Sequence, residues 1–459
     1  MAAQFELIPS TSDFQSTAEP LIIQVSESVV DTYYKYRFIL VIKDRSGTQL
    51  AKLKTHMLSA SNQVAVFDIS RVLDDYIGPN IVNGNSTAAT VLTLGRTGFS
   101  PANIVSESYQ QLPARQFTIE LSHEEAANPT GEPVETTPAE ATTTLFAFRD
   151  EFINYGDAYA RGDGSFQPSA STDNFLSSAP NLGTESKFGS AWGKVREHRI
   201  GTDQGSVMAY GAEGATAQYL LIRGFEADGT IIATASLDLD AVGGDTTPTT
   251  DAQAVQYIGV GPANLEEHAS AASNTDLTTL ITDADLAYYE LYLSSTSTVI
   301  QANQKSVVHR FTIDEGCTNY PRKQLMFLNR HGGWDFFNFD QKSEERLTGI
   351  ERSNYNRPRG NWDSVSTSVD WTYNGWERGV TTTTVKAEKQ VRVSTDYIDE
   401  GYNLHLRDIA TSRAVFTVEG TDLIPVTVTD SEYLFKTTAN DKLISYSFTL
   451  RFSNRPRLK

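Results

Sequence analysis

Apolar and polar residues alternate with a period of two over much of this chain, and this pattern constrains its fold most strongly. Residues 446–452 place Tyr and Phe or Leu at every second position, with Ser, Thr and Arg between them. Residues 34–42 repeat the pattern with Tyr, Phe, Leu and Ile. Because successive side chains of a strand point to opposite faces of a sheet, both segments predict half-buried antiparallel strands.

Turn residues separate these segments, and helical patterns are scarce. The sequence RSG at 45–47 and the pair Asp228-Gly229 each follow one apolar run and precede another, which is typical of β-hairpins. Only residues near 69–77 and 399–411 space their apolar side chains as short helices do. The predicted fold class is therefore all-β, with several antiparallel β-sandwich modules and a few short helices.

The length of 459 residues suggests about three domains. Residues 122–144 are rich in Glu, Pro, Thr and Ala and hold few large apolar side chains, so we expect a flexible acidic linker or long loop there. An N-terminal β-sandwich module is expected over 1–121. A connecting β and loop region is expected over 145–212, an immunoglobulin- or fibronectin-like sandwich over 213–320, and a C-terminal β module over 321–459.

Composition excludes several classes of protein. The formal net charge of −19 argues against binding to a nucleic-acid backbone, which needs a basic surface, so we expect no specific nucleic-acid recognition. The single cysteine, Cys317, excludes an internal disulfide framework and is better interpreted as a buried apolar thiol than as a nucleophile. The apolar runs fall far short of the ~20 residues of a membrane helix, and the N-terminal residues lack a signal-peptide pattern, so we expect no membrane insertion.

Catalytic and cofactor motifs are missing from the sequence. It contains no G-x-S-x-G elbow, no HExxH pair and no phosphate-binding P-loop. Gly259 and Gly261 lie in a β-rich context without the third glycine of a dinucleotide motif. Asp238 and Asp240 fit either a calcium site or a solvated strand end. We therefore predict a non-enzymatic protein without a cofactor, and leave calcium binding open.

The densest aromatic stretch is residues 320–341, YPRKQLMFLNRHGGWDFFNFDQ. Two glycines at 332–333 predict a hairpin turn. The large apolar residues on either side cannot all fall on one face of such a hairpin, so both faces are expected to be covered. His331 and Asp335 are interpreted as hairpin-end residues that hydrogen-bond locally rather than as a catalytic pair.

Four of the five tryptophans cluster between 334 and 376. They can fill a sandwich core or a subunit interface, or stack on sugar rings if they are exposed. We favour the first interpretation. The predicted contacts between modules or subunits are then made by Phe327, Trp334, Phe336, Phe337, Phe339, Trp362, Trp371 and Trp376.

Four blocks of the chain together resemble structural proteins of tailed bacteriophages, particularly phages of Bacteroidetes and marine bacteria. They are residues 20–77 with FDISRVLDDYI, residues 143–156, residues 317–339 with FLNRHGGWDFFNF, and residues 394–457 with NDKLISYSFTLRFSNRPR. The last block also looks, more loosely, like distal-tail and tail-adaptor modules. The middle region is similar to the sandwich domains that decorate virion proteins.

The resemblance implies a non-enzymatic virion structural protein that forms a homo-oligomeric ring or collar in the tail tip, baseplate or neck. Its partners would be further copies of itself and other phage tail or neck proteins. It would be assembled in the host cytoplasm and reside in the virion. The alternative is a carbohydrate-binding or carbohydrate-degrading protein of the tail that recognises a host surface glycan, which the tryptophan cluster and the many carboxylates motivate.

Overall fold

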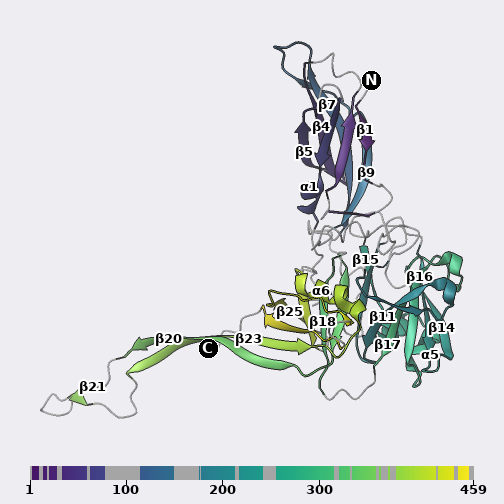
Figure 1. Ribbon diagram of the computed structural model, residues 1–459, viewed down its shortest axis with the longest axis vertical. Helices are drawn as coiled ribbons and strands as arrows, with labels where there is room; N and C mark the ends of the chain where they lie inside the picture. Colours follow the sequence, from purple (N-terminus) through teal and green to yellow (C-terminus); the bar gives the residue numbers. More distant parts are fainter. Residues whose placement is uncertain are drawn as a thin grey trace.

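The structure is a computed structural model, and strands account for 52% of it and helices for 13%. The predicted all-β, multi-sheet fold class is therefore confirmed. Figure 1 shows an elongated N-terminal unit above two units that lie side by side, and a long two-stranded arm that leaves the C-terminal unit. The residues that the structure describes are 3–9, 14–17, 20–27, 34–58, 63–77, 114–148, 175, 177–211, 217–240, 255–314, 320–330, 333–357, 361–362, 371–372, 379–419, 422–438 and 443–453.

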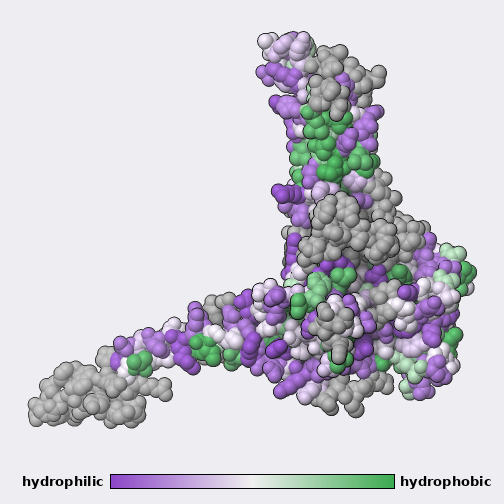
Figure 2. Space-filling model, viewed as in Figure 1, coloured by the Kyte–Doolittle hydropathy of each residue, from purple (hydrophilic) through white to green (hydrophobic). Residues whose placement is uncertain are grey.

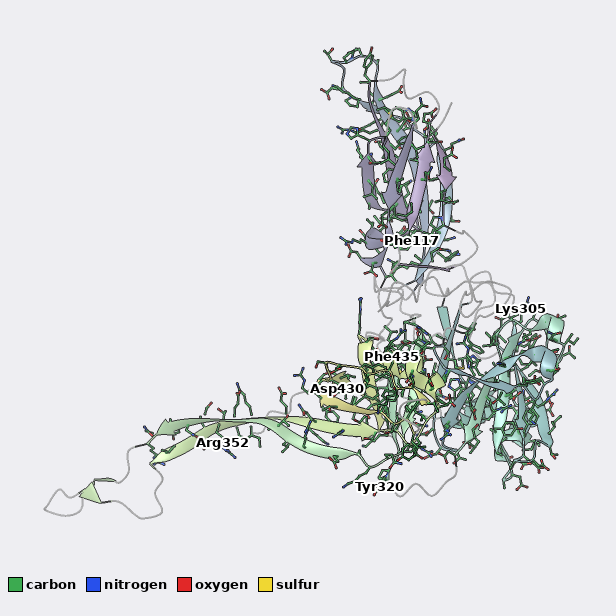
Figure 3. The ribbon with its side chains drawn as sticks, in the orientation of Figure 1. Phe117, Lys305, Tyr320, Arg352, Asp430 and Phe435 are labelled. Carbon is green, nitrogen blue, oxygen red and sulfur yellow. The ribbon has the colours of Figure 1, made fainter. Side chains whose placement is uncertain are left out.

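The N-terminal unit is a sandwich of two sheets with one core. One sheet has the order β1 (Gln4–Leu7), β3 (Ile22–Ser26), β6 (Val64–Asp68). The other has the order β2 (Phe14–Ser16), β9 (Ala141–Phe148), β7 (Ala114–Ala126), β4 (Tyr34–Asp44), β5 (Gln49–Thr55). Alternate residues of both sheets point inward, among them Ile23, Phe38 and Phe117 (Figure 3), which are fully buried. The short helix expected near 69–77 is α1 (Ser70–Asp74), whose Leu73 enters this core.

Residues 122–144 do not form the flexible linker that their composition predicts. They continue β7, pair through β8 (Val134–Glu135) and return as β9, which is hydrogen-bonded along β7 from Ala114 to Leu121. Their carboxylates meet cations of neighbouring strands: Glu124 pairs with Lys54, and Glu135 pairs with Lys52. The acidic residues are therefore cross-strand partners, and the sandwich extends to residue 148 rather than 121.

The middle unit is built on one six-stranded sheet. Its order is β10 (Asn181–Glu185), β11 (Lys194–Ile200), β17 (His309–Ile313), β16 (Tyr288–Ser294), β13 (Tyr219–Phe225), β14 (Ile231–Asp238), with β11 and β17 parallel. The hairpin predicted around Asp228-Gly229 joins β13 to β14, and Gly229 takes the positive φ of 91° that its turn requires. A separate pair, β12 (Val207–Gly211) with β15 (Val255–Gly259), lies beside this sheet.

Two helices take the place of the second sheet expected for an immunoglobulin-like module at 213–320. They are α4 (Pro262–Ala271) and α5 (Thr275–Thr282), and their Leu265, Leu277 and Leu280 are fully buried in the core of this unit. The unit also recruits β10 and β11 from before residue 213. Short 3₁₀ turns, η3 (Ser190–Trp192) and η5 (Gln301–Asn303), connect its strands.

The C-terminal unit is a seven-stranded antiparallel sheet with a helix on one face. Tyr402, Leu406 and Ile409 of η6 (Glu400–Tyr402) and α6 (Asn403–Thr411) pack on that face, where the second short helix was expected. The strand order is β19 (Trp334–Phe339), β18 (Lys323–Leu328), β24 (Val415–Glu419), β25 (Asp422–Val428), β26 (Ser447–Phe452), β23 (Val380–Ser394), β20 (Glu344–Asn356).

The last two strands of this sheet continue far beyond it as the arm, defined here as residues 344–394. β23 pairs with β26 only over Gln390–Ser394, whereas β20 and β23 pair with each other out to Asn356 and Val380. Near the far end lies the short pair β21 (Asn361–Trp362) and β22 (Trp371–Thr372). Figure 2 shows a mostly hydrophilic arm with isolated hydrophobic patches.

Candidate functional site

The aromatic hairpin β18–β19 lies between two cores. Leu325, Phe327 and Phe339 point to the core beneath α6. The alternate residues Met326 and Trp334 point to a second core on the opposite face. All five side chains are buried, so the prediction that both faces of the hairpin are covered is confirmed.

The second core is the contact between the middle and C-terminal units. It joins Trp334 and Met326 to Val207, Ala209 and Tyr257 of the pair β12–β15. Tyr257 is fully buried there, and burial raises the pKa of its hydroxyl. Large aromatic side chains from both units therefore hold this contact together, mainly through buried apolar area.

The other candidate interface residues are placed differently. Phe336 and Phe337 are half-buried on opposite faces of β19. Trp362 and Trp371 lie directly opposite each other in the β21–β22 pair near the end of the arm, and neither belongs to either core. Trp376, His331 and Cys317 lie outside the described residues.

Asp335 makes one hydrogen bond within the hairpin, as the sequence predicts, but its other partners lie far away in the chain. Its carboxylate accepts hydrogen bonds from Ser177 Oγ (2.8 Å), Ser178 N (2.8 Å), Ser178 Oγ (2.5 Å) and Asn329 Nδ2 (2.9 Å). The serines stand more than 150 residues before it in the chain. Arg196 of β11 donates to the Ser177 carbonyl at 2.7 Å, so this buried network ties the middle unit to the C-terminal unit.

Ser178, His405 and Asp335 have the residue types of a hydrolase triad, but their arrangement does not match one. In a triad the histidine bonds the serine with one ring nitrogen and the carboxylate with the other. Here Ser178 Oγ bonds both Asp335 and His405 Nδ1 (3.0 Å), and that same Nδ1 stands 3.6 Å from the Asp335 carboxylate. All three side chains are buried and hydrogen-bonded within the cluster, as in a structural network.

A second polar cluster adjoins the first, with His309 fully buried and His198 half-buried. His198 of β11 and His309 of β17 are stacked, with Nε2 and Nδ1 2.9 Å apart, and the His198 ring lies on Phe311. Burial lowers the pKa of His198 to about 3 and lowers the pKa of His309 well below its usual value. Both rings are therefore neutral near pH 7 and share one hydrogen bond, which suits a packed core rather than acid–base chemistry.

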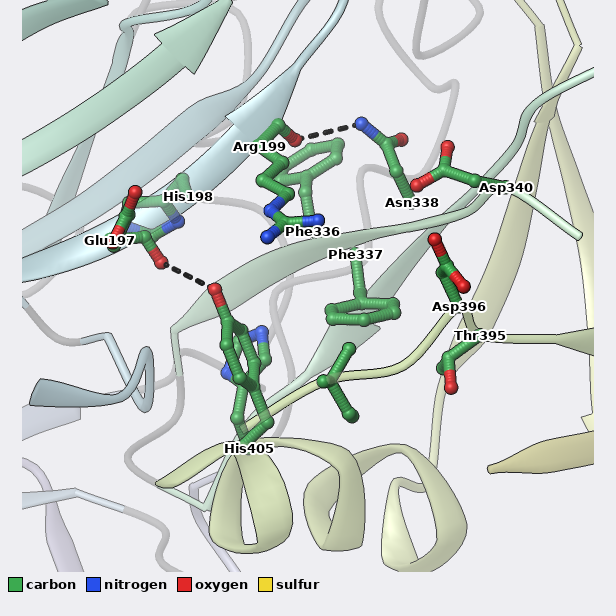
Figure 4. Close-up of a pocket in the computed structure, with 12 residues that line it drawn as sticks. Glu197, His198, Arg199, Phe336, Phe337, Asn338, Asp340, Thr395, Asp396 and His405 are labelled. Carbon is green, nitrogen blue, oxygen red and sulfur yellow. Dashed lines mark hydrogen bonds between the residues drawn. The ribbon is translucent and has the colours of Figure 1, made fainter. Parts of the chain in front are cut away.

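Figure 4 shows the hollow that these elements line. Its walls come from β11, β19, η6 and α6, and include Glu197, Phe337, Asp396 and His405. Its interior has space for only about two water molecules. Small-molecule sites are an order of magnitude larger, so this hollow is too small to hold a substrate or an organic cofactor.

The remaining sequence candidates do not gather into a ligand site. Asp238 accepts the backbone N–H of Asp240 at 3.0 Å, as at a strand end. Across the described residues, no group of three His, Cys, Asp or Glu side chains is placed to hold a metal ion.

Gly259 and Gly261 do open a strand–turn–helix unit, which the sequence interpretation missed. A Cβ on Gly261 would stand 2.4 Å from Ser206 N and 2.7 Å from Gly205 C. The backbone carbonyls of Ser206 and Gln204 also accept hydrogen bonds from the N–H groups of Gly261 and Ala263, respectively. Both glycines therefore serve close packing, and the chain itself covers this helix start.

Comparison with known proteins identifies no family for this chain. The sequence matches no protein-family model and no curated protein. Within the described part of the chain, the longest α-helix has ten residues, and no helix is long and apolar enough to cross a membrane.

Proposed function

We propose that this chain is a non-enzymatic structural subunit of a tailed-phage virion, which assembles as a homo-oligomeric ring or collar in the tail tip, baseplate or neck. The observation that carries the proposal is the arm. An isolated two-stranded ribbon is at best marginally stable in water, and the arm's apolar residues Leu347, Ile350, Tyr355 and Val380 are 49–58% exposed. An element of this kind gains its stability from a second molecule, as expected of a protein whose role is assembly.

Two further features agree with this role. The described clusters of Ser, His and Asp side chains are buried and internally bonded, and the hollow beside them is too small for a substrate. The resemblance to phage structural proteins includes the aromatic hairpin, whose residues hold two units of the chain together. Rigid β units joined by buried contacts suit a load-transmitting particle component.

The test begins with the purified chain. Light scattering should give a mass several times that of one 50.5 kDa chain, and electron microscopy of the same sample should show rings. Antibodies to the chain should label the tail tip, baseplate or neck of purified virions. A protein that stays monomeric at all concentrations, or that is absent from virions, contradicts the proposal.

One observation favours the alternative function, recognition of a host glycan. Trp362 and Trp371 stand opposite each other near the end of the arm, which is where a receptor-binding element would project. Glycan binding should then be lost in Trp362→Ala and Trp371→Ala while oligomerisation is retained. If both variants and the unaltered chain fail to bind a panel of host surface glycans, the alternative is removed.

A further inference from the structure

The arm exposes unpaired backbone as well as apolar side chains. β20 is the last strand in its sheet, so the outer edge of Glu344–Asn356 has no strand beside it among the described residues. On the other side, β23 has β26 beside it only from Gln390 onward. The arm therefore carries two open edges of about ten residues each, and open edges template the addition of another strand.

Charges and bulges shield the arm only in part against such pairing: five of the 13 residues of β20 are charged, yet apolar side chains remain exposed beside them. Natural edge strands are commonly shielded by charges, prolines or bulges. The β20–β23 pairing contains two irregularities, one between Thr348 and Glu351, where Gly349 has φ +62°, and one between Ser353 and Asn354. Ile350, inside the first, is still half exposed. Arg352 is exposed on the arm (Figure 3).

Charge distinguishes the arm from the rest of the chain and points to its partner. Residues 344–394 contain eight Lys or Arg and seven Asp or Glu, a net charge of +1. The other residues contain thirty Lys or Arg and fifty Asp or Glu, a net charge of −20. Two bodies of −20 repel each other, whereas the arm can approach such a body without that penalty and with weak attraction.

We propose that the arm of one copy docks on the acidic body of a second copy, through the open edge of β20 and its exposed apolar side chains. The inference rests on the proposed function, since it names the element by which subunits of the ring hold each other. Each copy gives one arm and receives one, a head-to-tail contact that closes into a ring when the rotation between neighbours allows. The exposed apolar surface of the arm is buried in the process, and the ribbon gains a neighbouring surface that stabilises it.

The decisive variant shortens the arm and spares the body. Arg346 and Gln390 are register partners, so a two-residue Asn-Gly turn can join them in place of residues 347–389. None of the described hydrophobic clusters contains a residue from that segment, whereas Val391 and Val393, which are buried in the C-terminal core, are kept. The thermal unfolding midpoint should therefore stay close to that of the full chain, while light scattering should show single chains.

A single substitution with a matched control tests the same contact without a deletion. Ile350→Asp places a carboxylate on the arm, and Ile300→Asp makes the same change on the middle unit at a residue equally exposed, 48% against 49%. We expect at least a tenfold rise in the dissociation constant of the oligomer for Ile350→Asp and no change for Ile300→Asp. Benzoylphenylalanine at position 355 should crosslink to the body of another copy on irradiation.

The outcomes separate this inference from the proposed function. If the full chain forms rings and the shortened variant forms them equally well, the arm is not the subunit contact and the inference fails while the function stands. A dissociation constant left unchanged by Ile350→Asp, or crosslinks confined to single chains, also overturns it. If the full chain is monomeric under all conditions, the proposed function itself fails.

Discussion

Replacing Asp335 by alanine is expected to destabilise the contact between the middle and C-terminal units by about 4 kcal/mol. The carboxylate accepts four hydrogen bonds in a buried site. The two serine hydroxyls can rotate toward other acceptors. The backbone N–H of Ser178 cannot, and Asn329 is held because its Oδ1 accepts the N–H of Gly333. Each buried donor left without an acceptor costs about 1–3 kcal/mol, so two such donors cost about 2–6 kcal/mol.

Asparagine at the same position should cost about half as much. Its amide oxygen can serve the three donors that now meet Oδ2, while its NH₂ group faces Ser177 Oγ, which is able to accept. Asp276→Ala removes an exposed carboxylate from the first turn of α5 and serves as the control, with an expected change below about 1 kcal/mol.

Urea denaturation followed by circular dichroism measures the loss, and hydrogen exchange of the Ser178 amide localises it. The alanine variant should exchange this amide faster than the unaltered chain, with the asparagine variant between them. If Asp335→Ala lies within 1 kcal/mol of the unaltered chain and the amide stays protected, the network does not stabilise this contact.

Three other outcomes test separate parts of the structure. Glutamyl endopeptidase should leave the bond after Glu124 intact in the folded protein, because this residue is buried and paired within β7; rapid cleavage there would restore the linker interpretation. Gly261→Ala should destabilise the middle unit by about 1–3 kcal/mol in thermal unfolding, because the added Cβ meets the backbone of Ser206, whereas an unchanged midpoint would show that the strand–helix contact yields. As pH falls from about 6.5 toward 3, the unfolded chain protonates His198 and the folded protein does not, so stability should fall by up to about 1.4 kcal/mol per pH unit. His198→Phe keeps a ring on Phe311 and should reduce this slope in denaturation curves recorded at several pH values; an equal slope would mean that His198 is already protonated in the folded state.

Sequence periodicity sufficed where burial alone decides the local structure. The alternation at 446–452 corresponds to β26, one face of which meets a core. The pattern at 34–42 corresponds to β4, but Phe38 to Ile42 are buried on both faces, and Tyr34 is exposed because the register shifts between Tyr34 and Arg37. The burial of both faces of the hairpin at 320–341 was also predictable, since large apolar residues occupy both odd and even positions along its strands. Its two faces enter two different cores, as such a pattern requires.

Polar composition misled the prediction where charges have partners elsewhere in the chain. Glu124 and Glu135 look solvated in isolation, yet their partners Lys54 and Lys52 come from β5, about 70–80 residues earlier. The helix α5 was missed because half of its residues are threonine, which favours strands, while only Leu277 and Leu280 are fully buried.

The buried networks could not be predicted, because their members are brought together only by the packing of whole units. Ser178 and His405 are separated by 227 residues. Neither lies in a motif, and no local pattern encodes the register of β11 against β17 that places His198 beside His309. The residue types of a triad are present, but only the geometry shows that they form a structural cluster.

The continuity of β23 has a mechanical consequence. This strand runs unbroken from Val380, far out on the arm, to Ser394 inside the seven-stranded sheet. A pull along the arm is therefore parallel to the strand and loads its hydrogen bonds to β26 in shear, all at once, instead of unzipping them one by one. Those bonds lie over the buried Val391 and Val393, so tension on the arm is delivered directly to the core beneath α6.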